Sequence, residues 1–226
     1  MPAIIELQNV TRTYHLGDED LNALNSVSLS IEKGAFVAII GPSGSGKTTL
    51  ANIIGGLDKP SSGTVTVDGV DLSRARDSKL SAYRNKHLGF VFQSFNLQGN
   101  NTVLENVMLP MVFARVKAKE RRDRAKACLE AVGLGDRLKF KPTQLSGGQR
   151  QRVAIARALS LQPSIIIADE PTGNLDSSRG EEILKILKDL NKQGITLLII
   201  THDQDIAKQA QHIVRIQDGH LTEHRG

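Results

Sequence analysis

The sequence has no tryptophan, one cysteine and an aromatic content of only 4 %. A single thiol, Cys128, excludes a disulfide within the chain and is typical of a protein in a reducing compartment. No apolar run reaches the roughly 20 residues that a membrane-spanning helix needs. The first residues alternate like a strand, and no basic segment precedes an apolar one, so we expect no signal peptide.

Acidic residues are outnumbered: 29 lysines and arginines stand against 24 aspartates and glutamates, which gives a net charge of +5. A basic protein can bind nucleic acid or an anionic membrane face. The densest basic run, residues 117–126, is interrupted by Glu120 and Asp123 and contains no aromatic residue that could stack on a base. We therefore interpret it as a solvated helix face and expect no nucleic-acid partner.

Strand patterns alternate with helical patterns along most of the chain, which predicts an α/β fold. The first 40 residues indicate strands joined by turns, and residues 64–69 indicate a short strand at a sheet edge. Near-continuous apolar runs, typical of buried parallel strands, occur at 35–40, 88–92, 164–170 and 195–200.

Only helical patterns occur between about residues 94 and 162, including apolar stripes over 103–115 and 119–132. Because strands resume afterwards, we interpret this stretch as an inserted helical subdomain. The prediction is a single domain over residues 1–226. Its core and β subdomain are expected to comprise residues 1–93 and 163–226.

A glycine-rich segment stands between the first buried strand and the helix that follows it. From Gly41 to Thr48 it reads GPSGSGKT, which fits G-x-x-x-x-G-K-[ST] at each fixed position. Glycines let backbone N–H groups converge on a polyphosphate where side chains would block the approach. Lys47 is expected to reach the β- and γ-phosphates and the Thr48 hydroxyl to bind Mg²⁺. The residues expected to line this nucleoside triphosphate site are Gly41, Ser43, Gly44, Ser45, Gly46, Lys47, Thr48 and Thr49.

Polar side chains also follow three other buried strands, as Gln93, Asp169–Glu170 and His202. Ligands of open α/β sheets bind beyond the carboxyl ends of the strands, so we expect these residues to converge on the same nucleotide. Asp169 is expected to hold Mg²⁺ together with Thr48, and Glu170 to orient or deprotonate an attacking water. Gln93 could contact both metal and water, and His202 could donate to the γ-phosphate.

A second anion-binding feature lies in the helical region, at Leu145–Gln149. Ser146 is placed as a helix N-cap, and Gly147 and Gly148 leave the positive N-terminus of that helix bare. One γ-phosphate can use both features only if a subdomain folds over or a second copy supplies one of them. The helix rules alone do not choose between these alternatives.

Together these motifs resemble the ATP-binding subunit of ABC transporters over nearly the whole chain. The matching segments are Gly41–Thr48 (Walker A), Gln93 (Q-loop), Leu145–Gln149 (signature), Ile165–Asp169 with Glu170 (Walker B and catalytic carboxylate), Asn174–Asp176 (D-loop) and His202 (switch histidine). Tyr14 matches the aromatic residue that stacks on adenine. The stretch Ala168–Asp176 resembles in particular the group of macrolide exporters, lipoprotein-releasing systems and cell-division ATPases.

The resemblance implies a Mg²⁺-dependent ATPase with ATP and Mg²⁺ as its cofactors. The fold it implies is that of a P-loop NTPase with a mainly parallel sheet core, an N-terminal antiparallel β subdomain and an inserted α-helical subdomain. The residues it assigns to catalysis are Glu170, His202, Gln93 and Lys47, and those it assigns to the metal are Thr48, Gln93 and Asp169.

The resemblance further implies a head-to-tail dimer of two copies. The residues expected to contact the ATP held by the other copy are Ser146, Gly147, Gly148, Gln149 and Asp176. It also implies that a membrane permease on a separate chain docks on Phe95, Leu97 and the stripe over 103–113. The protein would then be cytoplasmic, peripheral on the inner face of the cell membrane.

An alternative of a different class is a soluble ABC ATPase of cofactor assembly or DNA metabolism, with no membrane partner. DNA-repair relatives carry long heptad insertions between Walker A and the signature, and residues 49–144 show none. A cofactor-assembly ATPase stays open. Copurification with a multi-spanning protein would favour transport, and a soluble partner would favour the alternative.

Overall fold

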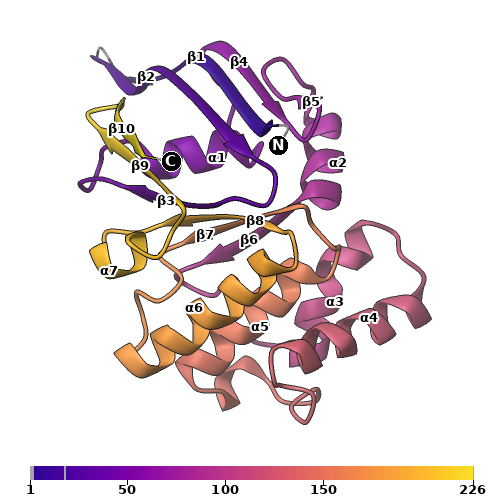
Figure 1. Ribbon diagram of the computed structural model, residues 1–226. Coiled ribbons are helices and arrows are strands. Elements are labelled where there is room, and N and C mark those ends of the chain that lie inside the picture. The colour runs from indigo at the N-terminus through magenta and orange to yellow at the C-terminus, as the bar shows by residue number, and fades with distance from the viewer. Residues whose placement is uncertain (1–2, 18, 226) are drawn as a thin grey trace.

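Two β-sheets are stacked with helix α1 between them, and a layer of helices covers the far side of the second sheet (Figure 1). The computed structural model describes residues 3–17 and 19–225. The strands are β1 (Ala3–Leu16), β2 (Glu19–Glu32), β3 (Phe36–Ile40), β4 (Ser62–Val67), β5 (Val70–Asp71), β6 (Leu88–Phe92), β7 (Ile165–Asp169), β8 (Thr196–Ile200), β9 (His212–Gln217) and β10 (His220–Arg225). The helices are α1 (Lys47–Ile54), α2 (Asp77–His87), α3 (Val103–Phe113), α4 (Ala118–Ala131), the 3-10 turn η1 (Pro142–Gln144), α5 (Gly147–Leu159), α6 (Ser177–Lys192) and α7 (Gln204–Ala207).

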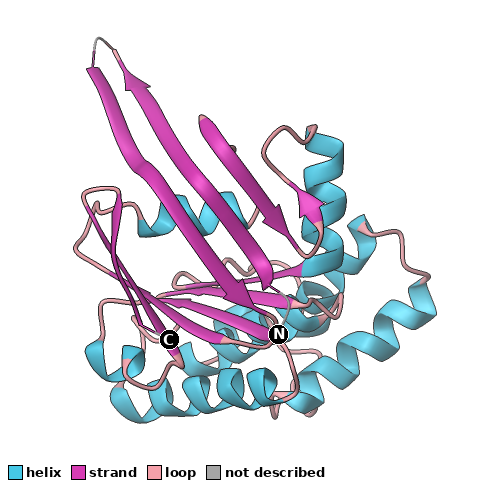
Figure 2. Ribbon diagram, turned by 45° about the horizontal axis from the view of Figure 1, so that its top comes forward, coloured by secondary structure: helices cyan, strands magenta, loops and turns pink. Residues whose placement is uncertain are grey.

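The first sheet is antiparallel and has the strand order β2-β1-β4-β5. Its long strands β1 and β2 rise away from the helical layer, as Figure 2 shows. The prediction of an edge strand at residues 64–69 is wrong in one respect. β4 lies between β1 and β5, because the chain turns back after Val67 and Val70 pairs with it.

The second sheet has the order β10-β9-β3-β8-β7-β6, in which β9, β3, β8, β7 and β6 are parallel. β7 shows why its sequence is almost purely apolar. Ile165 and Ile167 pack into the core that contains α1, whereas Ile166 and Ala168 pack into the core that contains α5. The sheet is therefore covered on both faces, and α1 and α5 lie on opposite sides of it.

Helices α3, α4 and α5 lie between β6 and β7 in the chain and pack on one another. α3 ends at Phe113 and not at the predicted residue 115, because Arg115 adopts a left-handed backbone with φ of 56°. Leu104, Val107 and Met111 are buried, but Val112 and Phe113 are exposed. The end of the apolar stripe on α3 therefore faces solvent.

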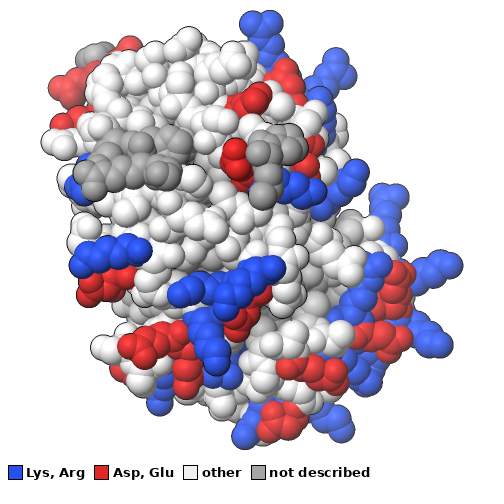
Figure 3. Space-filling view, viewed as in Figure 1, with Lys and Arg blue, Asp and Glu red and all other residues white. Residues whose placement is uncertain are grey.

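Charges of both signs intermix over the lower part of the molecule in Figure 3. On α4, Arg124 forms an ion pair with Glu120 one turn away. The helices in the described part of the chain are all too short or too polar to cross a membrane. The architecture confirms the predicted fold class, a mainly parallel sheet core with an antiparallel N-terminal sheet and a helical part.

Candidate functional site

The glycine-rich loop joins the carboxyl end of β3 to the first turn of α1. It packs closely against the backbone of two other strands, β9 and β2. A Cβ on Gly41 would lie 2.0 Å from the carbonyl oxygen of Ile216 in β9. A Cβ on Gly46 would lie 2.2 Å from the carbonyl oxygen of Ala23 in β2, and Gly46 also has a φ of 104°. Only glycine fits at these two positions, so the pattern of the loop is imposed by close backbone packing.

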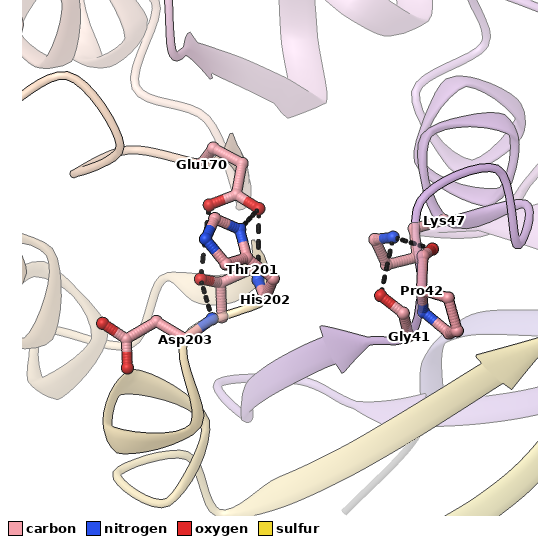
Figure 4. Close-up of polar contacts among 7 residues, drawn as sticks. All are labelled: Gly41, Pro42, Lys47, Glu170, Thr201, His202 and Asp203. Carbon is pink, nitrogen blue, oxygen red and sulfur yellow. Dashed lines mark hydrogen bonds and ion pairs between the residues drawn. The ribbon is translucent and has the colours of Figure 1, made fainter.

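The loop carries the donors that an anion needs. No side chain caps α1, so its first N–H groups point out of the helix end. Lys47 Nζ folds over the loop and donates to the carbonyl oxygens of Gly41, at 2.9 Å, and Pro42, at 2.6 Å (Figure 4). Ser45 is 4 % exposed, and its hydroxyl has no hydrogen-bond partner among the described residues. An ammonium, a buried hydroxyl and open N–H groups in one loop fit a polyphosphate.

The four predicted polar positions lie at the ends of four neighbouring parallel strands. In the sheet, β3 pairs with β8, β8 with β7, and β7 with β6. The register aligns Asp169 of β7 with Ile200 of β8 and with Phe92 of β6. Gln93, Glu170 and Thr201 therefore leave the sheet at one level, and the glycine-rich loop leaves β3 beside them. In Figure 4 the Lys47 side chain, bonded to the carbonyl oxygens of its own loop, lies opposite the Glu170–His202 pair.

Glu170 is the most fixed of these residues. Its backbone is left-handed, with φ of 45°, and its amide donates to the carbonyl oxygen of Ile200 at 2.9 Å. His202 contacts the carboxylate through both Nδ1, at 2.6 Å, and its backbone N–H, at 3.1 Å. The Glu170 side chain is only 18 % exposed, whereas that of His202 is 78 % exposed. Contacts with Ile200 and His202 thus fix Glu170, whereas the His202 ring is largely exposed to solvent.

Asp169, the last residue of β7, lies next to Glu170 in the chain, and its pKa is shifted by its surroundings. Burial raises the pKa of Asp169, the neighbouring Glu170 carboxylate raises it further, and the Lys47 ammonium acts in the opposite direction. Mg²⁺ is commonly held by one or two carboxylates together with substrate phosphates. Asp169, the exposed hydroxyl of Thr48 and the amide of Gln93 supply oxygen donors of that kind.

Gln93 is exposed and lies against the loop that follows Glu170. A Cβ on Gly173 would lie 2.8 Å from Gln93 Nε2, and the Asn174 side chain donates to the Gln93 carbonyl oxygen at 2.9 Å. After Gln93 the chain enters two left-handed residues, Phe95 and Asn96. Arg157 of α5 donates to both of their carbonyl oxygens, at 2.9 and 2.5 Å. The Q-loop is thereby fixed to the helical layer.

Ser146 is the N-cap of α5, as predicted, and forms a capping box with Gln149. The Ser146 hydroxyl accepts from the Gln149 amide at 3.3 Å, and the Gln149 side chain accepts from the Ser146 amide at 3.0 Å. Gly147 packs on Leu175, and Gly148 packs on Arg179. Asp176 in turn caps α6 by accepting from the Arg179 amide at 3.0 Å. The signature and D-loop residues therefore form one cluster.

That cluster is separate from the phosphate loop. The loop begins α1 on one face of the six-stranded sheet, and the signature begins α5 on the opposite face. Within one chain, the helix that begins after Ser146 and the helix that begins at Lys47 therefore lie on opposite faces of the sheet. This separation bears on the choice that the sequence left open, because a second copy can supply the missing contacts.

Tyr14 lies in β1, half-buried, opposite Leu21 of β2 in the strand register. Its ring contacts Arg12, and its hydroxyl binds Asp58. The sequence did not single out Arg12, Asp58 or Arg157. Their contacts join residues 44 to 62 positions apart, and no local pattern signals such contacts.

The chain matches the ABC transporter family over residues 24–173. The uncharacterized ABC transporter ATP-binding protein YvrO of Bacillus subtilis is 52 % identical over 97 % of this chain and 96 % of its own length. The macrolide export ATP-binding/permease protein MacB of Syntrophobacter fumaroxidans is 49 % identical, and 99 % of this chain corresponds to 32 % of that longer protein.

A solved dimeric structure of the ATP-binding cassette MJ0796, in a post-hydrolysis state with ADP and Pi, superposes with a TM-score of 0.90. It is 47 % identical, over 98 % of this chain and 97 % of that one. The loop, strand-end and signature motifs that the structure arranges agree with these likenesses, and the chain belongs to the ABC transporter family as one of its ATP-binding proteins.

Proposed function

We propose that this protein is a Mg²⁺-dependent ATPase subunit that powers a membrane ABC complex through ATP-driven pairing of two copies. The observation that carries the proposal is the alignment of the Lys47 loop with Asp169, Glu170 and His202 on neighbouring strand ends. The proposal treats residues 1–226 as a single ABC ATPase domain, with an inserted helical subdomain at about 94–162.

In this mechanism the loop amides and Lys47 bind the β- and γ-phosphates. Thr48, Gln93 and Asp169 would hold a Mg²⁺ ion, which would neutralise negative charge on the phosphate oxygens. Water attacks the γ-phosphorus, its proton passes to Glu170, and the bond to the β–γ bridging oxygen breaks to give ADP and phosphate. His202 orients Glu170 and donates to the γ-phosphate.

Pairing of two copies follows from the position of the signature. Ser146 and the first turn of α5 lie on the face of the sheet away from the loop of the same chain. In a head-to-tail dimer, the Ser146–Gln149 segment and Asp176 of one copy contact the nucleotide held by the loop of the other. The MJ0796 cassette is described as dimeric, which supports this arrangement.

The test of the ATPase proposal compares nucleotide binding and hydrolysis with and without Mg²⁺. The wild-type protein is expected to hydrolyse ATP only with the divalent cation, and Lys47→Ala is expected to lose nucleotide affinity itself. Equilibrium dialysis measures the affinity, and phosphate release measures the rate. Unchanged ATP affinity in Lys47→Ala would show that the phosphate loop account is wrong.

For the membrane partner, the supporting feature is a hollow of about 310 Å³ to which α3 contributes Pro110. It is lined in part by Phe90, Phe92 and Pro110. Phe113, 71 % exposed, stands on the same helix as Pro110. We place the permease contact here and the protein at the cytoplasmic face of the membrane.

Copurification from detergent extracts tests this contact. A multi-spanning protein is expected to accompany the wild type and to be lost with Phe113→Asp, while the ATPase rate of the isolated subunit stays unchanged. Lys192→Asp, at the exposed end of α6, is the control and should retain the partner. Retention of only a soluble partner would favour the cofactor-assembly or DNA-metabolism alternative.

A further inference from the structure

The ring of Tyr14 is held at one face and at its hydroxyl. The Arg12 guanidinium lies over the ring, 4.5 Å from its centroid. The Tyr14 hydroxyl donates to Asp58 Oδ2 at 2.7 Å. Arg12 binds the same carboxylate with two nitrogens, Nε to Oδ2 at 2.9 Å and Nη2 to Oδ1 at 2.9 Å. Three side chains from two segments thus form one closed set of contacts, the Arg12–Tyr14–Asp58 bracket.

Asp58 ties this bracket to the C-terminal end of α1, the helix whose other end begins at the phosphate loop. It lies just beyond α1, the helix that the loop begins, and its amide and that of Leu57 donate to the Asn52 carbonyl oxygen at 3.2 and 2.8 Å. The Arg12 and Asp58 side chains are 24 % and 22 % exposed, so their bidentate pair is largely withdrawn from water. The ring is therefore fixed relative to the helix that would carry the phosphates.

We propose that Arg12 and Asp58 are positioning residues that hold Tyr14 as a stacking platform for the nucleobase. The inference rests on the proposed function, because it assumes a nucleotide at the phosphate loop. The guanidinium occupies one face of the ring, and the base stacks on the other. Fixing the hydroxyl prevents the ring from swinging, so the platform does not have to be ordered when the nucleotide binds.

A stacking platform of this kind also determines how well the site distinguishes one nucleobase from another. A stacking ring contacts the π-face of a base, which every base has, and it reads none of the hydrogen-bonding groups on the base edge. The bracket uses the Tyr14 hydroxyl and the Asp58 carboxylate internally. These groups are therefore not available to discriminate one purine from another, and ATP and GTP are expected to bind with similar affinity.

The test separates the base from the phosphates by comparing ATP with inorganic tripolyphosphate in isothermal titration. Asp58→Asn and Arg12→Met are expected to weaken ATP binding by about 5- to 10-fold, a part of the value of a stacked base. Both are expected to leave tripolyphosphate affinity unchanged. Tyr14→Ala should bring ATP affinity down furthest, and Tyr14→Phe, which keeps the ring, should lie between it and the wild type. In hydrolysis, KM for ATP should rise while kcat at saturation is kept.

Thr13→Ala is the matched control, since Thr13 lies on the same strand and its hydroxyl binds Asn22 outside the bracket. It should change neither affinity. Equal losses for ATP and tripolyphosphate in Asp58→Asn would mean general structural damage and would overturn the inference, as would unchanged ATP affinity in both variants. A different result would show that the proposed function is wrong. In that case Lys47→Ala would bind tripolyphosphate as tightly as the wild type does.

Discussion

Glu170 illustrates how a single residue is prepared for a role by its backbone. A left-handed conformation costs a non-glycine residue roughly 1–2 kcal/mol. The contact of its amide with Ile200 and the contacts of its carboxylate with His202 hold it in that conformation. In this conformation the carboxylate contacts Thr201 and His202, the residues that follow β8.

Replacing that carboxylate tests its role at the residue scale. Glu170→Gln keeps the size of the side chain but cannot accept a proton from water. We expect ATP binding to persist and turnover to fall on the order of 10²- to 10⁴-fold, the usual worth of a general base. Single-turnover phosphate release measures the effect. Turnover near that of the wild type would remove Glu170 from the mechanism, and Glu130→Gln on exposed α4 serves as the control.

At this scale, the sequence predicted the site residues from motifs because the chemistry demands particular residue types at fixed spacing. It could not predict the Arg12–Tyr14–Asp58 bracket or the hold of Arg157 on the Q-loop. Those contacts join segments that are far apart in the chain, and they depend on how the two sheets and the helical layer pack.

Among the elements, α5 and α3 begin in the same way, each with a capping box. Ser146 pairs with Gln149 on α5, and Thr102 pairs with Glu105 on α3. Only the α5 cap belongs to the proposed dimer contact. The two helices therefore provide a matched pair for separating the stability of a helix from its function.

Ser146→Ala and Thr102→Ala are each expected to lower the free energy of unfolding by about 1 kcal/mol, because each removes one N-cap. In the Glu170→Gln background, only Ser146→Ala should also abolish ATP-dependent association. Urea unfolding and analytical ultracentrifugation measure the two effects. Loss of association in both variants would indicate that stability, and not a contact by Ser146, controls pairing.

A second element-scale feature is the joint between the two sheets. Asp68, after β4, accepts from Ser164 at 2.8 Å, before β7, and from His87 at 2.6 Å, at the end of α2. Burial alone would raise the pKa of Asp68, but the hydrogen bonds from Ser164 and His87 outweigh it and hold the pKa below its ordinary value. Three elements thus depend on one ionised carboxylate.

A lowered folded-state pKa stabilises the fold above the unfolded-state pKa, and the stabilisation is lost as the pH falls through the folded value. Asp68→Asn should therefore lower the free energy of unfolding near pH 7, by about 1–2 kcal/mol. The difference in free energy of unfolding between Asp68→Asn and the wild type should become smaller below about pH 3.9, because the Asp68 carboxylate then begins to be protonated. Denaturant unfolding between pH 3 and 8 measures this. If the difference in free energy of unfolding did not change with pH, the proposed role of the Asp68 carboxylate would be wrong. As the control, Asp123→Asn at an exposed position should have the same free energy of unfolding as the wild type.

Helices and strands could be predicted from the sequence where burial of one or both faces leaves a regular pattern of apolar residues. β3, β7 and β8 were predicted from near-continuous apolar runs, since each packs on both sides. The position of β4 was not, because the two-residue strand β5 that covers it is too short to leave a pattern. The ends of α3 also depended on a backbone conformation at Arg115 that residue type does not dictate.

For the whole molecule, the decisive property is that α1, which begins at the phosphate loop, and α5, which begins at the signature, lie on opposite faces of one sheet. In the proposed mechanism a single copy holds a triphosphate in the loop of Lys47, and its own Ser146 caps a helix on the other face of the sheet. In the proposed dimer, two copies arranged head to tail would bring each loop to the signature of the other copy. Hydrolysis would then remove the γ-phosphate that both copies contact, and we expect the pair to loosen.

The most direct test is the molar mass of Glu170→Gln in solution, measured by light scattering with and without ATP and Mg²⁺. The account predicts the 24.6 kDa mass of one chain without nucleotide and about twice that mass with ATP. Addition of Lys47→Ala should prevent the change. A mass that stays at that of one chain, at an ATP concentration that dialysis shows to be saturating, would contradict the account.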